Sequence, residues 1–209
     1  EDVGLEDMEL VLTARSGHHA VRNALQKLSF HDFTDEEFEQ IFEMFLQLAD
    51  AKKEVYDHDL YIIVEDYYKK VEKNNPNRQK YSNQFYALGD LQVISNSAFP
   101  SASIEIIKGN EIMKSSAVGS GPIDALYSAI ANITNMDVKL VEYNISSVSR
   151  GKEAIGKVKI VIEHNETKYI AKAADTDILK ASALAYINAI NSIVVAQLNT
   201  VNNEIPENV

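Results

Sequence analysis

The residues best suited to chemistry lie in one short segment, Gly119-Ser-Gly-Pro-Ile-Asp124. Gly119 and Gly121 permit unusual backbone conformations, Pro122 suits the first turn of a helix, and an apolar helical pattern follows. A phosphate loop would also need Lys and Ser or Thr after the glycines, or a third glycine at dinucleotide spacing. Neither is present, and Asp124 would repel phosphate. The alternatives are packing against the protein itself or a small polar ligand whose ammonium group is held by backbone groups and Asp124.

Other candidate chemistry is weaker. His18 and His19 are adjacent, so on a helix they point in different directions and cannot chelate one metal. No G-x-S-x-G elbow marks a serine nucleophile, and the chain has no cysteine. The acids at 57, 59, 65 and 66 lack the glycine and spacing of a calcium loop, so we interpret them as a solvated surface. The sequence therefore predicts no catalytic residue and no metal ligand.

Composition narrows the class of protein. The 209 residues are 45% hydrophobic and 24% charged, as in a globular protein with a core, and the net charge of −11 argues against nucleic-acid or membrane partners. Residues 1–80 hold 18 acids and 10 bases, against 13 and 10 in the rest, which suggests two regions with different surfaces. We see no signal peptide or membrane span, and the absence of cysteine fits a cytoplasmic protein. Because the chain starts at Glu1, we expect it to be a piece of a longer protein.

The elements around these residues fall into two patterns. Apolar positions recur at helical spacing over 16–28, 34–50 and 57–71, and Thr34 with Glu37 forms a capping box. A polar, proline-broken stretch at 73–83 then indicates a linker. The sequence therefore predicts a helical part over 1–80.

After the linker the apolar period changes from 3.6 to about 2. Three strand-like segments and a helix from Pro122 to about Thr134 are followed by three more and a helix from Asp177 to about Leu198. We therefore expect an α+β fold in which 81–209 holds two βββα repeats, about 81–136 and 137–200. From the residues alone, such a domain would either sense a small molecule or only dimerise.

Four segments, in order, extend this interpretation. They are LVLTARSGHHAVRNAL (10–25), LQLADAKKEVYDHDL (46–60), GSGPIDALYSAI (119–130) and DTDILKASALAYINAIN (175–191). Each resembles a motif of the 2-isopropylmalate synthase family, and together they cover nearly the whole chain. The resemblance is to the linker subdomains and the C-terminal regulatory domain of paired βββα units.

In that family a metal-dependent TIM barrel condenses acetyl-CoA with 2-oxoisovalerate in leucine biosynthesis, and leucine inhibits by binding the regulatory domain. Nothing in this chain resembles the barrel. The resemblance therefore implies a non-catalytic regulatory fragment of a transferase, cytoplasmic and homodimeric, without a cofactor of its own, whose partners are leucine and the barrel of the full protein. The alternatives are the regulatory part of a citramalate or homocitrate synthase, and a dimerisation module without effector binding.

The resemblance also implies a set of effector contacts near the two helix starts. Carried over by motif, they are Ser120, Gly121, Ile123, Leu140, Tyr143, Ser147, Ala154, Gly156, Ala174 and Thr176. Ala171 and Ala173 stand where the family often has glycine, which is the reason for the second alternative. Arg15 stands where the family has a histidine that is thought to reach the partner's active site.

Overall fold

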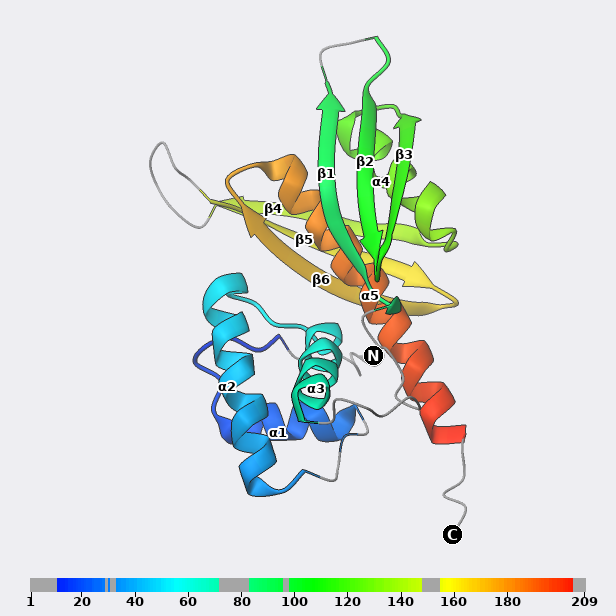
Figure 1. Ribbon diagram of the computed structural model, residues 1–209. Coiled ribbons are helices and arrows are strands. Elements are labelled where there is room, and N and C mark those ends of the chain that lie inside the picture. Colours follow the sequence, from blue (N-terminus) through cyan, green and yellow to red (C-terminus); the bar gives the residue numbers. More distant parts are fainter. Residues whose placement is uncertain are drawn as a thin grey trace, which may run out of the picture. The chain divides into compact units, whose positions relative to one another are not determined.

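The computed structural model describes residues 11–28, 30, 33–71, 83–95, 98–147 and 155–204, without the side chains of 147 and 201–204. These residues form two compact units (Figure 1). The helical unit contains residues up to Gln84 together with Val194 onward, and the sheet unit contains Phe85–Ile193. The predicted linker falls almost entirely outside the described residues.

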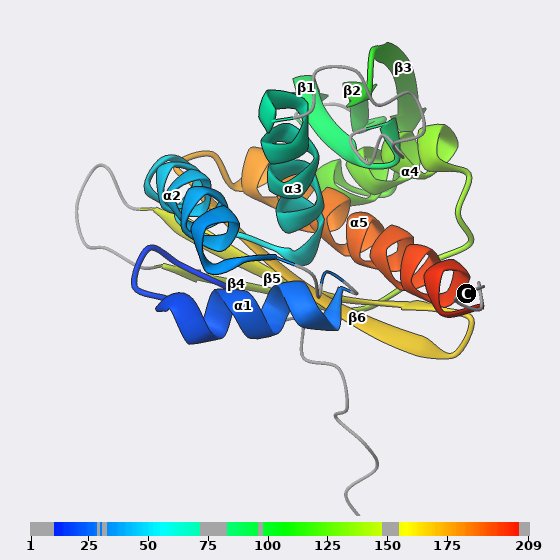
Figure 2. The same cartoon turned by 60° about the horizontal axis from the view of Figure 1, so that its bottom comes forward.

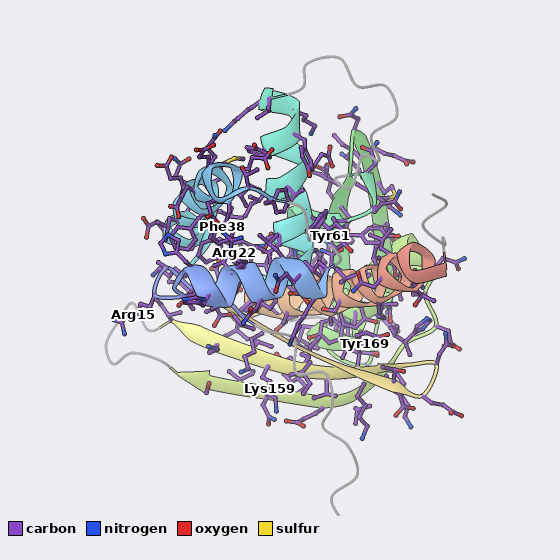
Figure 3. The ribbon with its side chains drawn as sticks, turned by 90° about the horizontal axis from the view of Figure 1, so that it is seen from below. Arg15, Arg22, Phe38, Tyr61, Lys159 and Tyr169 are labelled. Atoms are coloured by element: carbon purple, nitrogen blue, oxygen red, sulfur yellow. The ribbon has the colours of Figure 1, made fainter. Side chains whose placement is uncertain are left out.

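Before the first strand, the described residues of the helical unit form α1 (His18–Lys27), α2 (Asp35–Lys52) and α3 (Asp57–Val71). The predicted capping box is present, since Glu37 N–H donates to Thr34 Oγ1 at 3.2 Å and Thr34 N–H donates to the Glu37 carboxylate at 2.9 Å. Phe38 and Phe45 are buried on the inner face of α2, and the Arg22 guanidinium lies 4.1 Å from the centre of the Phe38 ring (Figure 3). This cation–π contact and the stacking of His18 on Phe42 join α1 to α2.

The acids of α3 are not the solvated surface that the sequence suggests. Asp59 and Glu65 are 5% and 6% exposed, so that prediction is wrong for both. Both Asp59 carboxylate oxygens accept from Lys52 Nζ, at 2.7 and 2.8 Å, and Glu65 pairs with Lys69 at 2.7 Å. A buried carboxylate needs such a partner, because its desolvation is otherwise too costly. Asp59 also accepts from Tyr56 N–H, which fixes the turn between α2 and α3.

The strands and the last two helices form two βββα repeats, which confirms the predicted α+β fold. The first repeat contains β1 (Tyr86–Ile94), β2 (Ser101–Lys108), β3 (Glu111–Val118) and α4 (Pro122–Thr134). The second contains β4 (Lys139–Ser147), β5 (Gly156–His164), β6 (Thr167–Asp175) and α5 (Ile178–Glu204). Each set of strands is an antiparallel meander in sequence order. Tight turns explain this, since Gly109 in one and Asn165 and Glu166 in the other adopt positive φ.

Each sheet has one face covered by its helix. In the first sheet, Ala102, Ile104 and Ile106 alternate with more exposed residues along β2, and α4 packs on β2 and β3. In the second, Val158, Ile160 and Ile162 are fully buried along β5, and α5 runs along this sheet (Figure 2). The period-2 pattern in each central strand therefore selects the covered face.

Helix α5 is largely buried between Ala181 and Val195. By length and composition Ile178–Thr200 could cross a membrane, but 78% of its most apolar window is buried in the structure, as in a core helix. Its buried polar side chains are bonded: Asn188 Nδ2 donates to Lys172 O at 3.2 Å, and the Ser182 hydroxyl donates to Ile178 O. These bonds allow a polar residue to lie within an apolar core.

Candidate functional site

The segment Gly119–Gly121 forms a tight loop between β3 and α4. Gly119 N–H donates to Pro100 O at 3.0 Å, and a Cβ on Gly119 would lie 2.3 Å from the backbone nitrogen of Ala125. Only glycine therefore permits this close approach to the helix. The Asp124 carboxylate accepts from both Ser120 N–H and Ser120 Oγ, at 2.7 and 2.9 Å, and these bonds hold its pKa below the usual value.

The two helices that end the repeats begin differently. Gly121 is the N-cap of α4 and has no side chain to accept from the first turn, and Pro122 follows it. At α5, by contrast, the Asp177 carboxylate accepts from Leu179 N–H at 2.8 Å and from Lys180 N–H at 3.4 Å. The N-terminus of α4 thus has no side-chain cap, whereas Asp177 caps that of α5.

A cavity of about 620 Å³ opens beside the uncapped end of α4. Its residues come from the loop, from α4, from the chain leading into β4, and from α5. They are Ser120, Gly121, Pro122, Ile123, Asp124, Tyr127, Ser128, Ala131, Val138, Leu140 and Tyr186. The lining is mainly apolar, and its acid, Asp124, is exposed and already bonded to Ser120. The cavity is therefore suited to an apolar side chain.

Aromatic residues form one side of the cavity. Tyr127 of α4 and Tyr186 of α5 stack with ring centres 4.3 Å apart, and Tyr143 of β4 meets Tyr127 edge-on at 6.3 Å. The Tyr143 hydroxyl lies 2.8 Å from Ser182 Oγ and donates to it, since Ser182 itself donates to Ile178 O. Burial raises the pKa of Tyr127 above its usual value and that of Tyr186 to about 12, so both are neutral.

The structure separates the predicted contact residues into two groups. Ser120, Gly121, Ile123 and Leu140 line the cavity, whereas Tyr143 does not line it and contacts the ring of Tyr127. At the other end of the second sheet, the Ser147 backbone pairs with Gly156, Ala174 is exposed on β6, and Thr176 is exposed before α5. Ala154 lies outside the described residues. The seven-residue offset from Leu140 to Ser147 spans about 24 Å of strand, so one small ligand cannot touch both groups of one chain.

Sequence reasoning missed several lining residues, notably Tyr127 and Tyr186. Tyr127 follows Ile123 by one helical turn, so the periodicity of α4 could have identified it. Tyr186 is distant in sequence from the loop, and only the packing of α5 against α4 brings it to the cavity. Tertiary contacts of this kind leave no local pattern in the chain.

The positions that depart from the family pattern lie away from this cavity. Ala171 and Ala173 pair with Ile160 and Val158 on the covered face of the second sheet, are 1% and 8% exposed, and do not line it. Their methyl groups therefore do not reduce its volume. Arg15 is exposed, in a turn where Thr13 N–H donates to Ser16 Oγ (Figure 3).

Comparisons with known proteins identify the family of this chain. The family model described as "LeuA allosteric (dimerisation) domain" matches residues 54–194. The chain is 49% identical over 195 residues to a 2-isopropylmalate synthase of Geobacillus sp. (strain Y412MC10), covering 93% of this chain and 36% of that protein. It is 36% identical over 198 residues to a 2-isopropylmalate synthase of Olsenella uli, and this match covers 92% of this chain and 36% of that protein.

A third relative, the 2-isopropylmalate synthase of Yersinia pestis (strain Pestoides F), is 34% identical over 194 residues, 92% of this chain and 35% of that protein. The chain thus spans about a third of the length of the curated relatives it matches. The family match includes the loop, the cavity and both βββα repeats as far as residue 194, within α5. The chain belongs to the LeuA allosteric (dimerisation) domain family.

Proposed function

We propose that this chain is the regulatory part of a 2-isopropylmalate synthase and that it binds leucine in the cavity beside α4. The observation that carries the proposal is an apolar cavity at a helix N-terminus without a side-chain cap. The ligand's carboxylate accepts from the first N–H groups of α4, and its side chain lies against Ile123, Leu140 and Tyr186. In the full protein, a cytoplasmic enzyme with a catalytic barrel, this binding inhibits the condensation of acetyl-CoA with 2-oxoisovalerate.

The lining also favours an apolar effector over a basic one. A lysine side chain would need a buried acid at the far end of the cavity, and the acid in the lining is the exposed Asp124. This argues against the effector expected for a homocitrate synthase. Isoleucine, the effector expected for a citramalate synthase, has the same volume as leucine, so it is the competitor to compare directly.

The separation of the two groups of predicted contacts supports a site shared by two chains. If Thr176 and Gly156 contact the same ligand as Leu140, a second copy must supply them, because they lie too far apart in one chain. A symmetric dimer would then contain two equivalent sites.

Calorimetric titration tests the proposal with leucine, isoleucine and lysine as ligands. We expect leucine to bind, isoleucine to bind more weakly and lysine to give no heat. Ile123→Ala should weaken leucine binding by about tenfold, since it removes part of an apolar contact. Ile112→Ala is the matched control, because Ile112 is 59% exposed on β3 and does not line the cavity. The absence of heat with all three amino acids would support the dimerisation module without an effector.

A mixing experiment tests the shared site. Leu140→Asp should abolish leucine binding by disrupting the contacts at the cavity. Thr176→Trp should abolish it by disrupting the contacts at the other end of the second sheet. When the two variants are mixed at random, about half of the dimers should be heterodimers, and each heterodimer should contain one intact site. The mixture should therefore bind about a quarter as much leucine as the parent protein. If each site lay within one chain, the mixture would bind nothing.

A further inference from the structure

We propose that strand β4 pairs with β4 of a second copy of this chain, and that this contact completes the effector site. The register of the pair rests on the proposed function, because it follows from the effector contacts. β4 is an outer strand of the second sheet, since the order of its strands is β4-β5-β6 (Figure 1). The side of β4 that faces away from β5 therefore carries backbone N–H and C=O groups that β5 does not bind, and these can pair with another strand.

The exposed side chains of β4 are unusually apolar for an outer strand. Leu140, Val141 and Ile145 are 39%, 45% and 53% exposed, whereas every large apolar residue of β6, the other outer strand, is less exposed. Native proteins protect a free edge with charges or proline, because an apolar edge pairs with other chains. β4 has no proline, and its acid, Glu142, is neutralised by Lys159 Nζ at 3.1 Å. The strand therefore has the properties of an edge that a partner covers.

A second copy is the partner that the family indicates. The family model describes a dimerisation domain, and the residues that it matches include the whole of β4. A strand that pairs with its own copy across a two-fold axis must be complementary to itself, so like charges must not lie opposite each other. This requirement can be checked once the register is known.

The effector contacts fix the register. One ligand touches both groups of predicted contacts only if Leu140 of one copy lies close to Ser147 of the other, together with Gly156, which pairs with Ser147. The two-fold axis of an antiparallel pair is perpendicular to the sheet, so residues opposite each other point to the same face and the axis passes through a residue. That residue is Asn144, which lies midway between Ser147 and Leu140 when the bulge at Val141 is counted with Leu140.

This register makes β4 complementary to itself. Asn144 lies opposite its own copy, Ile145 lies opposite Tyr143, and Glu142 lies opposite Ser146. Ile145 and Tyr143 both belong to the face that α5 covers, because they pair with fully buried residues of β5. Two apolar cross-strand pairs therefore flank the axis, and the acid of each strand meets a serine rather than another acid.

Disulfide cross-linking tests the register without any ligand. The chain has no cysteine, so one introduced cysteine reports on one position. The Cα atoms of residue 144 in the two copies should be about 4.5–5.5 Å apart, which is within the range that a disulfide spans. We expect Asn144→Cys to form a covalent dimer of the whole chain under mild oxidation.

Glu142→Cys and Ser146→Cys are the matched controls. Each lies two residues from the axis, so its two copies should be about 14 Å apart, which is too far for a disulfide. A mixture of the two variants should form a covalent heterodimer, because residue 142 of one copy lies opposite residue 146 of the other. A dimer in solution that does not cross-link through Asn144→Cys, or that cross-links through Glu142→Cys alone, would overturn the proposal.

A charge at the centre of the contact tests its apolar part. Ile145→Asp should weaken dimerisation about a hundredfold or more in sedimentation velocity, because each copy loses a buried isoleucine and places an unpaired carboxylate opposite Tyr143. Ile112→Asp is the matched control, because Ile112 is 59% exposed on β3, and it should change dimerisation less than about twofold. Equal dimerisation of the two variants would contradict the pairing, and circular dichroism shows that both are folded.

Calorimetry with leucine on the same samples separates this inference from the proposed function. We expect Ile145→Asp to lose leucine binding together with dimerisation, because the second copy supplies part of the site. If the parent binds no leucine but Asn144→Cys cross-links, the pairing stands and the proposed function fails. If the parent binds leucine and Asn144→Cys does not cross-link, the pairing fails and the proposed function stands.

Discussion

The loop before α4 allows one substitution to be tested at two glycines with opposite outcomes. In Gly119→Ala, the new Cβ would lie 2.3 Å from the Ala125 nitrogen and 2.8 Å from its Cα. Ordinary carbon contacts are no shorter than about 3.5 Å, and the obstacle is helix backbone rather than a flexible side chain. In Gly121→Ala, the new Cβ would have no atom within 4 Å, and φ of −157° is open to any residue.

The magnitudes follow from these contacts. Relieving the clash in Gly119→Ala must displace the loop or lose the bond to Pro100 O, so overpacking and one hydrogen bond together cost about 3 kcal/mol. Lower entropy of the unfolded chain returns about 0.5 kcal/mol. In Gly121→Ala the same entropy gain offsets a slightly poorer N-cap, so the change is near zero.

Thermal unfolding of both variants, followed by circular dichroism, measures the difference. For a chain of this length, a loss of about 2.5 kcal/mol lowers Tm by about 5–10 °C. We expect that shift for Gly119→Ala and less than about 2 °C for Gly121→Ala, which should bind leucine more weakly because its methyl group borders the cavity. Equal Tm values for the two variants would refute the close-approach reasoning.

Three further predictions concern the core. Burial raises the pKa of Asp57 to about 6, so its ionised form is disfavoured in the fold; Asp57→Asn should therefore stabilise the chain by about 2 kcal/mol at pH 7, with the gain disappearing below pH 4. Asn191→Ala leaves Tyr86 N–H and C=O unbonded and should cost about 3 kcal/mol in urea unfolding. Ala171→Gly should cost about 1 kcal/mol and leave leucine affinity unchanged, because Ala171 lies outside the cavity.

Each of these has a contrary result. A pH-independent gain in Asp57→Asn would mean that the carboxylate is not disfavoured by burial. Unchanged urea unfolding of Asn191→Ala would show that water replaces the two hydrogen bonds between Asn191 and Tyr86. Tighter leucine binding in Ala171→Gly would place that methyl group in the effector site.

Burial of His58 gives the chain a second pH response. Desolvation lowers its pKa from 6.5 to about 4, so the folded chain keeps it neutral while the unfolded chain protonates it. The unfolded state then binds more protons between these values, and stability falls as the pH falls from 6.5 towards 4. Asp57 acts in the opposite direction over part of this range, so Asp57→Asn should make acid unfolding steeper.

Local patterns in the sequence determined much of the fold. The Thr34–Glu37 capping box, the period-2 strands and the proline after Gly121 specify their elements through interactions between residues close in the chain. The glycine pattern also drew attention to the loop. The motif resemblance predicted Ile123 and Leu140 as contact residues, and both line the cavity although Leu140 lies in the second repeat.

Only the tertiary structure decided the rest, because long-range contacts have no local signature. It buried Asp59 against Lys52, brought Tyr186 to the cavity, and directed Ala171 toward the covered face of the second sheet, away from the cavity. It also placed the last turns of α5 in the helical unit, where Asn199 meets Tyr61. The sequence alone determined where the helices and strands form, and packing determined which of their side chains meet.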